Sequence, residues 1–414
     1  NDFDVSGLHG GGPFGGNEDL WVVKTDSVGN LIWQKCFGGT YIDNGSYGEQ
    51  TSDSGYVIIG SAESNDGDVV GSHGLDEIFI LRLDKVGNII WKKVYGGTGY
   101  DDGIVCKQLP DGNFIVAAYT TSNDGNISGN HNSSSDAWLS KLDTNGNIIW
   151  SRCYGGSGLD GIKRILVKND DSFILCGSTT SNDGDVSGQH GLEDIWVAAL
   201  SFVGDISWQA CYGGSGYDRC NDAILTNDGG IALVGSTTSI DGHVLNHRPS
   251  TNGFNDFFVM KTDSVGNLLW SSCFGGSGND FAYSLVSHSD MSYLIGGSTT
   301  SSDYDVTFNH GFGDSWIVKI EEIPNEIHSI HLSKTTFDCV IRDNNLVLDI
   351  SNLPVERITV AVFDISGRLS KSFLLTGFLG DNHFELPFHS AQGMYFVRIE
   401  VLNSYLSKKV VSVY

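Results

Sequence analysis

Basic residues are scarce in this chain. Its 414 residues include 24 Lys and Arg against 50 Asp and Glu, which gives a formal net charge of −26. Proteins that bind the phosphate backbone of nucleic acids need clustered basic residues, so this balance argues against a nucleic-acid partner. Long apolar runs are missing as well, since no stretch approaches the roughly 20 apolar residues of a membrane helix. We therefore expect a chain that does not span the membrane.

Recognisable catalytic motifs are also missing. The sequence has no Gly-x-Ser-x-Gly nucleophile elbow, no His-Glu-x-x-His metal motif and no glycine-rich phosphate loop. Carboxylates are abundant, yet the sequence singles out no pair whose surroundings differ as those of an acid and a base do. We expect no enzymatic activity.

What the sequence has instead is a repeated phrase. One tryptophan recurs at positions whose differences are 58, 59, 58 and 62: Trp33, Trp91, Trp150, Trp208 and Trp270. An aromatic residue that precedes it recurs six times, as Trp21, Phe79, Trp138, Trp196, Phe258 and Trp316. Self-similarity at a fixed period is typical of repeat architectures.

Each repeat reads as four short strands. In one copy they cover residues 138–142, 147–154, 162–168 and 173–178, and Gly-rich and Asn-rich turns separate them. We call the segment between the second and third strands the short loop (155–160), and the segment from the fourth strand to the next repeat the long loop (179–193). Helical periodicity is absent. Four strands per repeat with one aromatic motif each predict an all-β fold, a β-propeller with blades of about 58–62 residues.

The number of blades has two interpretations. Five complete sets of four strands are followed by one extra strand at 316–320, and residues 1–7 match the long-loop phrase at 182–188. We favour six blades, with three strands upstream of residue 1 completing the sixth; the alternative is five blades and a leftover strand. An intact mass well above 44.6 kDa would support six. The chain also opens without an initiator Met, so we expect that a signal peptide has been removed.

A second domain follows the repeats. The propeller is predicted over residues 1–320, and residues 321–327 read as a short polar linker. Residues 328–414 show a different pattern of short strands, which predicts a small C-terminal β-sandwich.

Three segments of this second domain occur in a familiar order. They are Val362-Phe363-Asp364-Ile365-Ser366-Gly367-Arg368, then Gly393-Met394-Tyr395-Phe396-Val397-Arg398-Ile399, then Lys408-Lys409-Val410-Val411 near the chain end. Together they resemble the type A C-terminal sorting domain of proteins exported by the type IX secretion system of Bacteroidota, over about 75 residues. The Tyr-Pro-Asn-Pro-like opening of that family is replaced by Leu332-Ser333-Lys334-Thr335. The propeller repeats are also similar to repeats of secreted proteins from that phylum.

The resemblance implies a route and a set of partners. Such proteins cross the inner membrane, fold in the periplasm and pass the outer membrane through a translocon that reads the sorting domain. They are then released or attached at the cell surface by shuttle and attachment proteins, commonly without the sorting domain. The resemblance implies that the sorting signal includes Asp364, Gly367, Arg368, Gly393, Tyr395, Lys408 and Lys409.

Acidic residues and histidines recur in the two loops, which we expect to open on one face of the propeller. The short loop always ends in Asp: Asp43, Asp101, Asp160, Asp218 and Asp280. Each long loop carries one His (His9, His73, His131, His190, His247 and His310), and the fullest copies carry an Asp-Gly-Asp. Carboxylates suit Ca²⁺, which makes Asp66, Asp68, Asp183 and Asp185 candidate ligands. The interpretation we favour is structural, because a feature repeated in every blade is usually scaffold. We expect that no cofactor is required.

Positions that differ between repeats are better candidates for binding. The residue before the short-loop Asp varies: Ile42, Tyr100, Leu159, Tyr217 and Asn279. One long loop carries an insert at 246–254. Exposed aromatic residues stack on ligands, so the candidate ligand-binding residues are Tyr100, Tyr217, His247, Arg248 and Phe254. The alternative is ordinary loop variation.

The cysteines have a largely apolar role. Cys36, Cys153, Cys211 and Cys273 share one repeat position that Val94 fills elsewhere, which indicates core thiols. A disulfide between Cys153 and Cys176 or between Cys211 and Cys220 stays open within one blade.

The sequence therefore predicts an exported cell-surface or secreted propeller that serves as a binding module for a glycan or a protein. The first alternative is a calcium-dependent lectin or adhesin. The second is a glycan-active hydrolase.

Overall fold

The computed structural model describes residues 5, 7–9, 18–132, 134–169, 172–247, 253–288, 292–321, 336–342, 345–353, 357–364, 368–376, 380–388, 393–401 and 404–412. All regular elements among them are strands, and none is a helix that could cross a membrane. The chain divides into two compact units, Asn1–Ile320 and Glu321–Tyr414. The division falls where the repeats end in the sequence.

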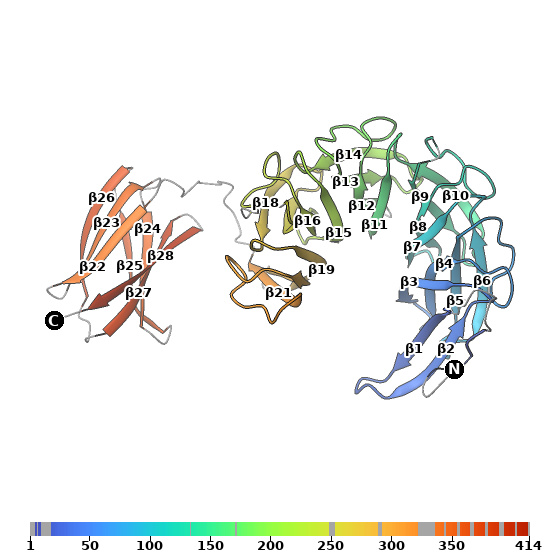
Figure 1. The fold of residues 1–414 in the computed structure, drawn as a ribbon, viewed down its shortest axis with the longest axis horizontal. Coiled ribbons are helices and arrows are strands. Elements are labelled where there is room, and N and C mark those ends of the chain that lie inside the picture. Colours follow the sequence, from blue (N-terminus) through green and yellow to red (C-terminus); the bar gives the residue numbers. More distant parts are fainter. Residues whose placement is uncertain are drawn as a thin grey trace. The chain divides into compact units, whose positions relative to one another are not determined.

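Four complete four-stranded antiparallel sheets form most of the first unit. They follow one another along an arc (Figure 1). Their strands are β3 (Asp43–Gln50), β4 (Tyr56–Ala62), β5 (Glu77–Leu83) and β6 (Ile89–Tyr95); β7 (Asp101–Gln108), β8 (Phe114–Thr120), β9 (Asp136–Leu142) and β10 (Ile148–Tyr154); β11 (Asp160–Val167), β12 (Phe173–Thr179), β13 (Asp194–Leu200) and β14 (Ile206–Tyr212); and β15 (Asp218–Leu225), β16 (Ile231–Thr237), β17 (Asp256–Thr262) and β18 (Leu268–Phe274).

The all-β propeller-type fold is confirmed, but each sheet straddles two sequence repeats. It joins the third and fourth strands of one repeat to the first and second strands of the next, as β11-β12-β13-β14 shows. The long loop is therefore the hairpin connection inside a sheet, and the short loop links one sheet to the next. Grouping the four strands of one repeat into one blade was wrong by half a repeat. The reason is that the fourth strand of one repeat pairs along its length with the first strand of the next, from Phe173 opposite Leu200 to Thr179 opposite Asp194.

The core lies between successive sheets. Strands β9 and β13 bury both faces, and Trp138 and Trp196 are 1% and 2% exposed. The recurring second-strand tryptophans are half-buried and pack onto the following sheet. Trp91 meets Phe114 edge-on with ring centroids 5.7 Å apart, and Gly146 of the next turn lies against the same indole. A side chain at Gly146 would strike this ring, and its φ of +79° also favours glycine.

Two incomplete sheets flank the complete ones. Strands β1 (Leu20–Thr25) and β2 (Leu31–Phe37) form one, while β19 (Asp280–His288), β20 (Ser292–Thr299) and β21 (Asp314–Glu321) form the other. Each exposes side chains that complete sheets bury: Ile317 is 67% exposed and its counterpart Val197 is 1% exposed. The extra strand predicted at 316–320 pairs inside this three-stranded sheet. The described residues of the first unit thus form four complete and two partial sheets, and the completion of a sixth blade by upstream strands stays a prediction.

The second unit is a β-sandwich. One sheet contains β22 (Thr336–Arg342), β23 (Asn345–Leu353) and β26 (Gly380–Pro387); the other contains β24 (Arg357–Asp364), β25 (Leu369–Thr376), β27 (Gly393–Val401) and β28 (Ser404–Ser412). Side chains of both sheets, including Leu348 and Val360, share one buried core. Most of the predicted linker lies outside the described residues.

The cysteines whose side chains are described are all unbridged. Seven of them are buried free thiols, among them Cys153, Cys176, Cys211 and Cys220. Neither disulfide left open by the sequence is formed. Burial raises the pKa of the Cys153 thiol to about 12, which keeps it protonated and unreactive.

Candidate functional site

The short loop is held by side chains that bind its backbone. In the loop before β7, four consecutive amides each donate to a side-chain oxygen. The Gly97 N–H donates to Asp101 (2.8 Å), Thr98 to Asp124 (2.8 Å), Gly99 to Ser122 (2.8 Å) and Tyr100 to Thr121 (2.8 Å). We call this set of acceptors the amide clamp. Because it satisfies every donor in turn, the loop has one conformation.

The amide clamp recurs in full at three other short loops, those before β11, β15 and β19. The N–H groups of Gly156, Ser157, Gly158 and Leu159 donate to Asp160, Asp183, Ser181 and Thr180 at 2.7–2.8 Å. Those of Gly214, Ser215, Gly216 and Tyr217 donate to Asp218, Asp241, Ser239 and Thr238 at 2.7–2.9 Å. The repeated Gly-, Ser-, Thr- and Asp-rich phrases of the two loops are therefore one structural device.

The candidate calcium ligands lie within this device. Asp183 accepts the Ser157 N–H, and Asp66 accepts the N–H and hydroxyl of Thr40. Asp185 accepts the Gly155 N–H at 3.3 Å, and a carboxylate oxygen of Asp68 lies 3.3 Å from the Lys92 ammonium. Among the described residues no group of three or more His, Cys, Asp and Glu side chains could hold a metal ion. These four side chains serve the scaffold.

A buried carboxyl pair closes each junction between sheets. At the β14–β15 junction, Asp194 and Asp218 are both fully buried. A Cβ built on Gly213 would lie 2.5 Å from an Asp218 oxygen and 2.8 Å from Asp194 Oδ1, so both carboxyls close over this glycine. Asp218 accepts the Gly214 N–H and the Thr237 and Ser239 hydroxyls, whereas Asp194 Oδ1 has no hydrogen-bond partner in the described structure.

The other oxygen of the first carboxyl in this pair, Oδ2 of Asp194, is bound by the histidine of the long loop. The backbone N–H of His190 donates to Asp194 Oδ2 at 2.9 Å, and its ring Nδ1 lies 2.7 Å from the same atom. His131 and Asp136 repeat this arrangement at 2.9 and 2.8 Å. Burial, together with the nearby Asp160, raises the pKa of Asp136 to about 6. The pKa of His131 is also raised. Burial alone would lower this pKa, but the Asp136 carboxylate raises it by more.

The two candidate residues of the insert that the structure describes are both at least partly buried. The His247 side chain is 6% exposed, and its Nδ1 lies 3.8 Å from Asp256, so it takes the scaffold place of the other histidines. The burial of this side chain contradicts the prediction that His247 belongs to an exposed binding surface. Phe254 is half-buried, and Arg248 lies outside the described residues.

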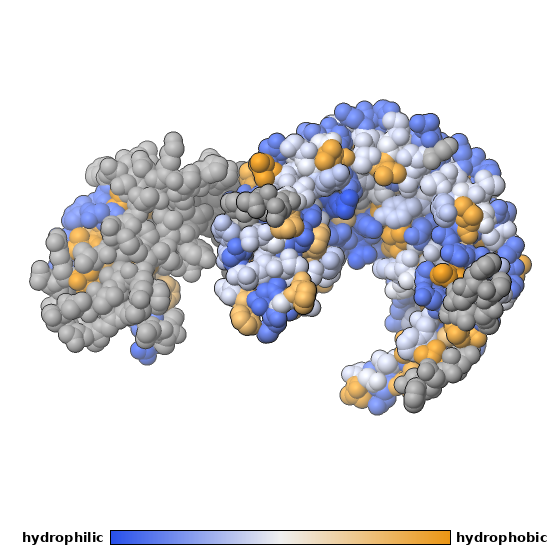
Figure 2. All heavy atoms as spheres, viewed as in Figure 1, coloured by the Kyte–Doolittle hydropathy of each residue, from blue (hydrophilic) through white to orange (hydrophobic). Residues whose placement is uncertain are grey.

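Three of the variable positions, Tyr100, Leu159 and Tyr217, are exposed to solvent. Tyr100 is 57% exposed and Tyr217 is 44% exposed, although the amide clamp fixes their backbone. Leu75 and Leu192 of the neighbouring long loops are also exposed, and each donates its N–H to a short-loop carbonyl, of Gly99 and Gly216. Arg219 lies over the Tyr217 ring at 5.5 Å and pairs with Glu193 at 2.7 Å. We call the end of the sheets that carries these loops the loop face. On the side of the first unit drawn in Figure 2, apolar side chains form separate patches among hydrophilic ones.

The predicted sorting residues lie on two strands and one hairpin of the second unit. The Arg368 N–H and Nε donate to Asp364 at 3.1 and 3.2 Å, which closes the β24–β25 turn. Gly393 and Tyr395 belong to β27, and Lys408 and Lys409 to β28, where they pair with Val397 and Phe396. The backbone register thus sets both lysines opposite β27. Gly367 lies outside the described residues.

Comparison with known proteins gives distant likenesses. No family model matches the chain. It is 22% identical over 342 residues to the regulatory protein FlaEY of Caulobacter vibrioides, which covers 75% of this chain and 35% of that protein. The chain thus spans about a third of this curated relative.

Among solved structures, a chimera of ACO and RPE65 aligns with a TM-score of 0.35 and 14% identity, over 81% of this chain and 61% of the other. A family 32 glycoside hydrolase from Bifidobacterium adolescentis aligns with a TM-score of 0.29 and 8% identity, over 89% and 76%. Another glycoside hydrolase gives 0.28 and 8%, over 88% and 95%.

Proposed function

We propose that this chain is an exported, non-enzymatic binding module. The observation that carries the proposal is the contrast at the loop face between a fixed frame and varied side chains. The full amide clamp repeats at four of the five described short loops, while the residue that it presents changes from Tyr to Leu to Asn. Exposed side chains on a rigid frame lose little conformational entropy on binding, which favours affinity.

The loop face suits a neutral glycan as ligand. Tyrosine rings offer flat apolar surfaces with a polar edge, and these surfaces stack on sugar rings. A net charge of −26 repels acidic polymers. The proposed binding uses no metal ion, since the candidate calcium ligands bind backbone amides or pair with Lys92. A protein ligand is the alternative outcome.

Removing both exposed tyrosines tests this role. We expect the Tyr100→Ala/Tyr217→Ala variant to lose at least about tenfold in affinity on a printed array of neutral glycans, because each ring is a candidate energetic anchor. The matched control is Ile90→Ala/Ile149→Ala, which removes similarly exposed apolar side chains from the second strands β6 and β10. Binding that survives in the tyrosine variant, or that falls equally in the control, would contradict the assignment of the loop face.

The proposal that the chain is exported depends on the second unit. We propose that the second domain, residues 328–414, is read by the type IX translocon and its shuttle and attachment partners. The described part supports this with a β-sandwich in which the first family segment begins on β24 and the other two lie on β27 and β28. Strand β28 is the last strand in its sheet, and such an edge can dock a partner strand.

A further inference from the structure

The strand that begins each sequence repeat carries a basic side chain near its end in every copy but one. The residues are Lys24, Arg82, Lys141, Lys261 and Lys319. In three of these copies the side chain crosses to the Asp in the turn between the third and fourth strands, whereas the Lys24 ammonium lies over the Tyr56 ring. Arg82 pairs with Asp53 at 2.6 Å, Lys141 with Asp111 at 3.0 Å and Lys261 with Asp228 at 2.7 Å. In sheet β11–β14 the equivalent residue is Ala199.

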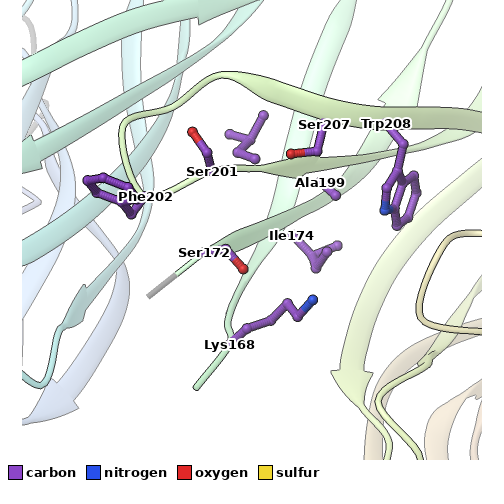
Figure 3. Close-up of a pocket in the computed structure, with 9 residues that line it drawn as sticks. Lys168, Ser172, Ile174, Ala199, Ser201, Phe202, Ser207 and Trp208 are labelled. Atoms are coloured by element: carbon purple, nitrogen blue, oxygen red, sulfur yellow. The ribbon is translucent and has the colours of Figure 1, made fainter. Parts of the chain in front are cut away.

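The missing side chain leaves a hollow. Arg82 and Lys261 are only 5% and 4% exposed, so their side chains fill the space that they cross. At Ala199 a hollow of about 310 Å³ opens instead, with Ile174 and Leu200 as part of its apolar lining. Figure 3 shows Ala199 and Ile174 beside it and the Trp208 indole at its side. This volume is at the lower end of ligand pockets, which are about 300–1,000 Å³, and suits one small ring.

The rim of the hollow is polar. Ser172, Ser201 and Ser207 line it, together with Lys168. The residues equivalent to Lys168 in the other complete sheets are the uncharged Thr51, Leu109 and Thr226. A positive charge is therefore kept at this corner while the bulk of the crossing side chain is lost. The net charge of −26 disfavours an anionic ligand.

We propose that this hollow binds one neutral hexose unit of a glycan. The Trp208 indole takes the apolar side of the sugar ring, and the serine hydroxyls and the Lys168 ammonium bind its hydroxyl groups. The hollow lies at the turn end of the sheet, opposite to the loop face, so the proposal stands or falls independently of the loop face.

Restoring the side chain found in the other sheets tests the proposal. Saturation-transfer NMR would be recorded on the full chain with the methyl glycosides of glucose, galactose and mannose. We expect transfer from at least one of them, with an affinity of about millimolar. Ala199→Lys should fold, since five of the six first strands carry a basic residue here, and should lose at least about tenfold in affinity. Lys168→Gln should weaken binding less.

The control adds the same charge elsewhere. Ile149→Lys places a lysine at an exposed position of β10, outside the hollow, and should bind like the wild type. No transfer from any of the three glycosides would overturn the proposal. Equal binding by Ala199→Lys and the wild type would also overturn it. The tyrosine variant of the loop face should retain this transfer, which separates failure of one site from failure of the other.

Discussion

Asp218→Ala is expected to destabilise the first unit by roughly 3–5 kcal/mol, because it leaves several buried donors without an acceptor. The carboxylate accepts the Gly214 N–H at 2.8 Å and the Ser239 hydroxyl at 2.7 Å, and it also accepts the Thr237 hydroxyl. Relief of repulsion from Asp194 offsets a small part of the loss. Urea unfolding of the full chain, followed by tryptophan fluorescence, measures the change.

Asp183→Ala is the matched control. This Asp is exposed and accepts the Ser157 N–H at 2.7 Å from the rim of the same kind of clamp. Loss of an exposed cap costs about 1 kcal/mol. If the two variants differed by less than about 1 kcal/mol, burial of the junction carboxyl would not be what stabilises the sheets.

The first unit should also lose stability as the pH rises from about 4 to about 7. The folded-state pKa of Asp136 is raised to about 6 from an ordinary 3.8, so the folded chain holds a proton that the unfolded chain releases. Stability is therefore fully present below the unfolded pKa and falls through this window by about 2–3 kcal/mol. The raised pKa of His131 acts in the same direction. The pKa of Asp228, lowered to about 2, sets the decline in stronger acid.

The Asp136→Asn variant separates the contribution of this carboxyl to the pH dependence from those of the other titratable groups. Asn keeps an acceptor for the His131 N–H and carries no charge, so we expect a flatter profile of melting temperature against pH and higher stability at pH 8. Asp314→Asn is the opposite control, because the N–H groups of His310 lower the pKa of Asp314 and its loss should destabilise the chain above pH 4. Identical profiles for both variants would contradict the account of the junction carboxyls.

The strands could be predicted from local pattern because each alternates around a Gly- or Asn-rich turn. Residues 147–154 and 173–178 were predicted and β10 and β12 were found at Ile148–Tyr154 and Phe173–Thr179. Which strands share a sheet could not be predicted, because a long hairpin loop and a link between two sheets look alike in sequence. Only pairing in three dimensions, such as Ser178 opposite Ile195, separates them.

The site was only partly predictable. The recurrence of Asp160 and Asp183 marked them as structural, but their joint hold on one short loop depends on a contact across 26 residues between Ser157 and Asp183. The hollow at Ala199 was missed, although the sequence carried its signal in the basic residues at the equivalent positions. A comparison of the repeats for residue types that one copy lacks would have identified Ala199.

The most direct test of an exported binding module is fractionation of the cells that produce it natively, with intact mass on each fraction. The account predicts that the first unit is found at the cell surface or in the medium, and that substitution of Asp364 and Arg368 keeps it inside. A full-length chain in the cytoplasm, unaffected by those substitutions, would contradict it.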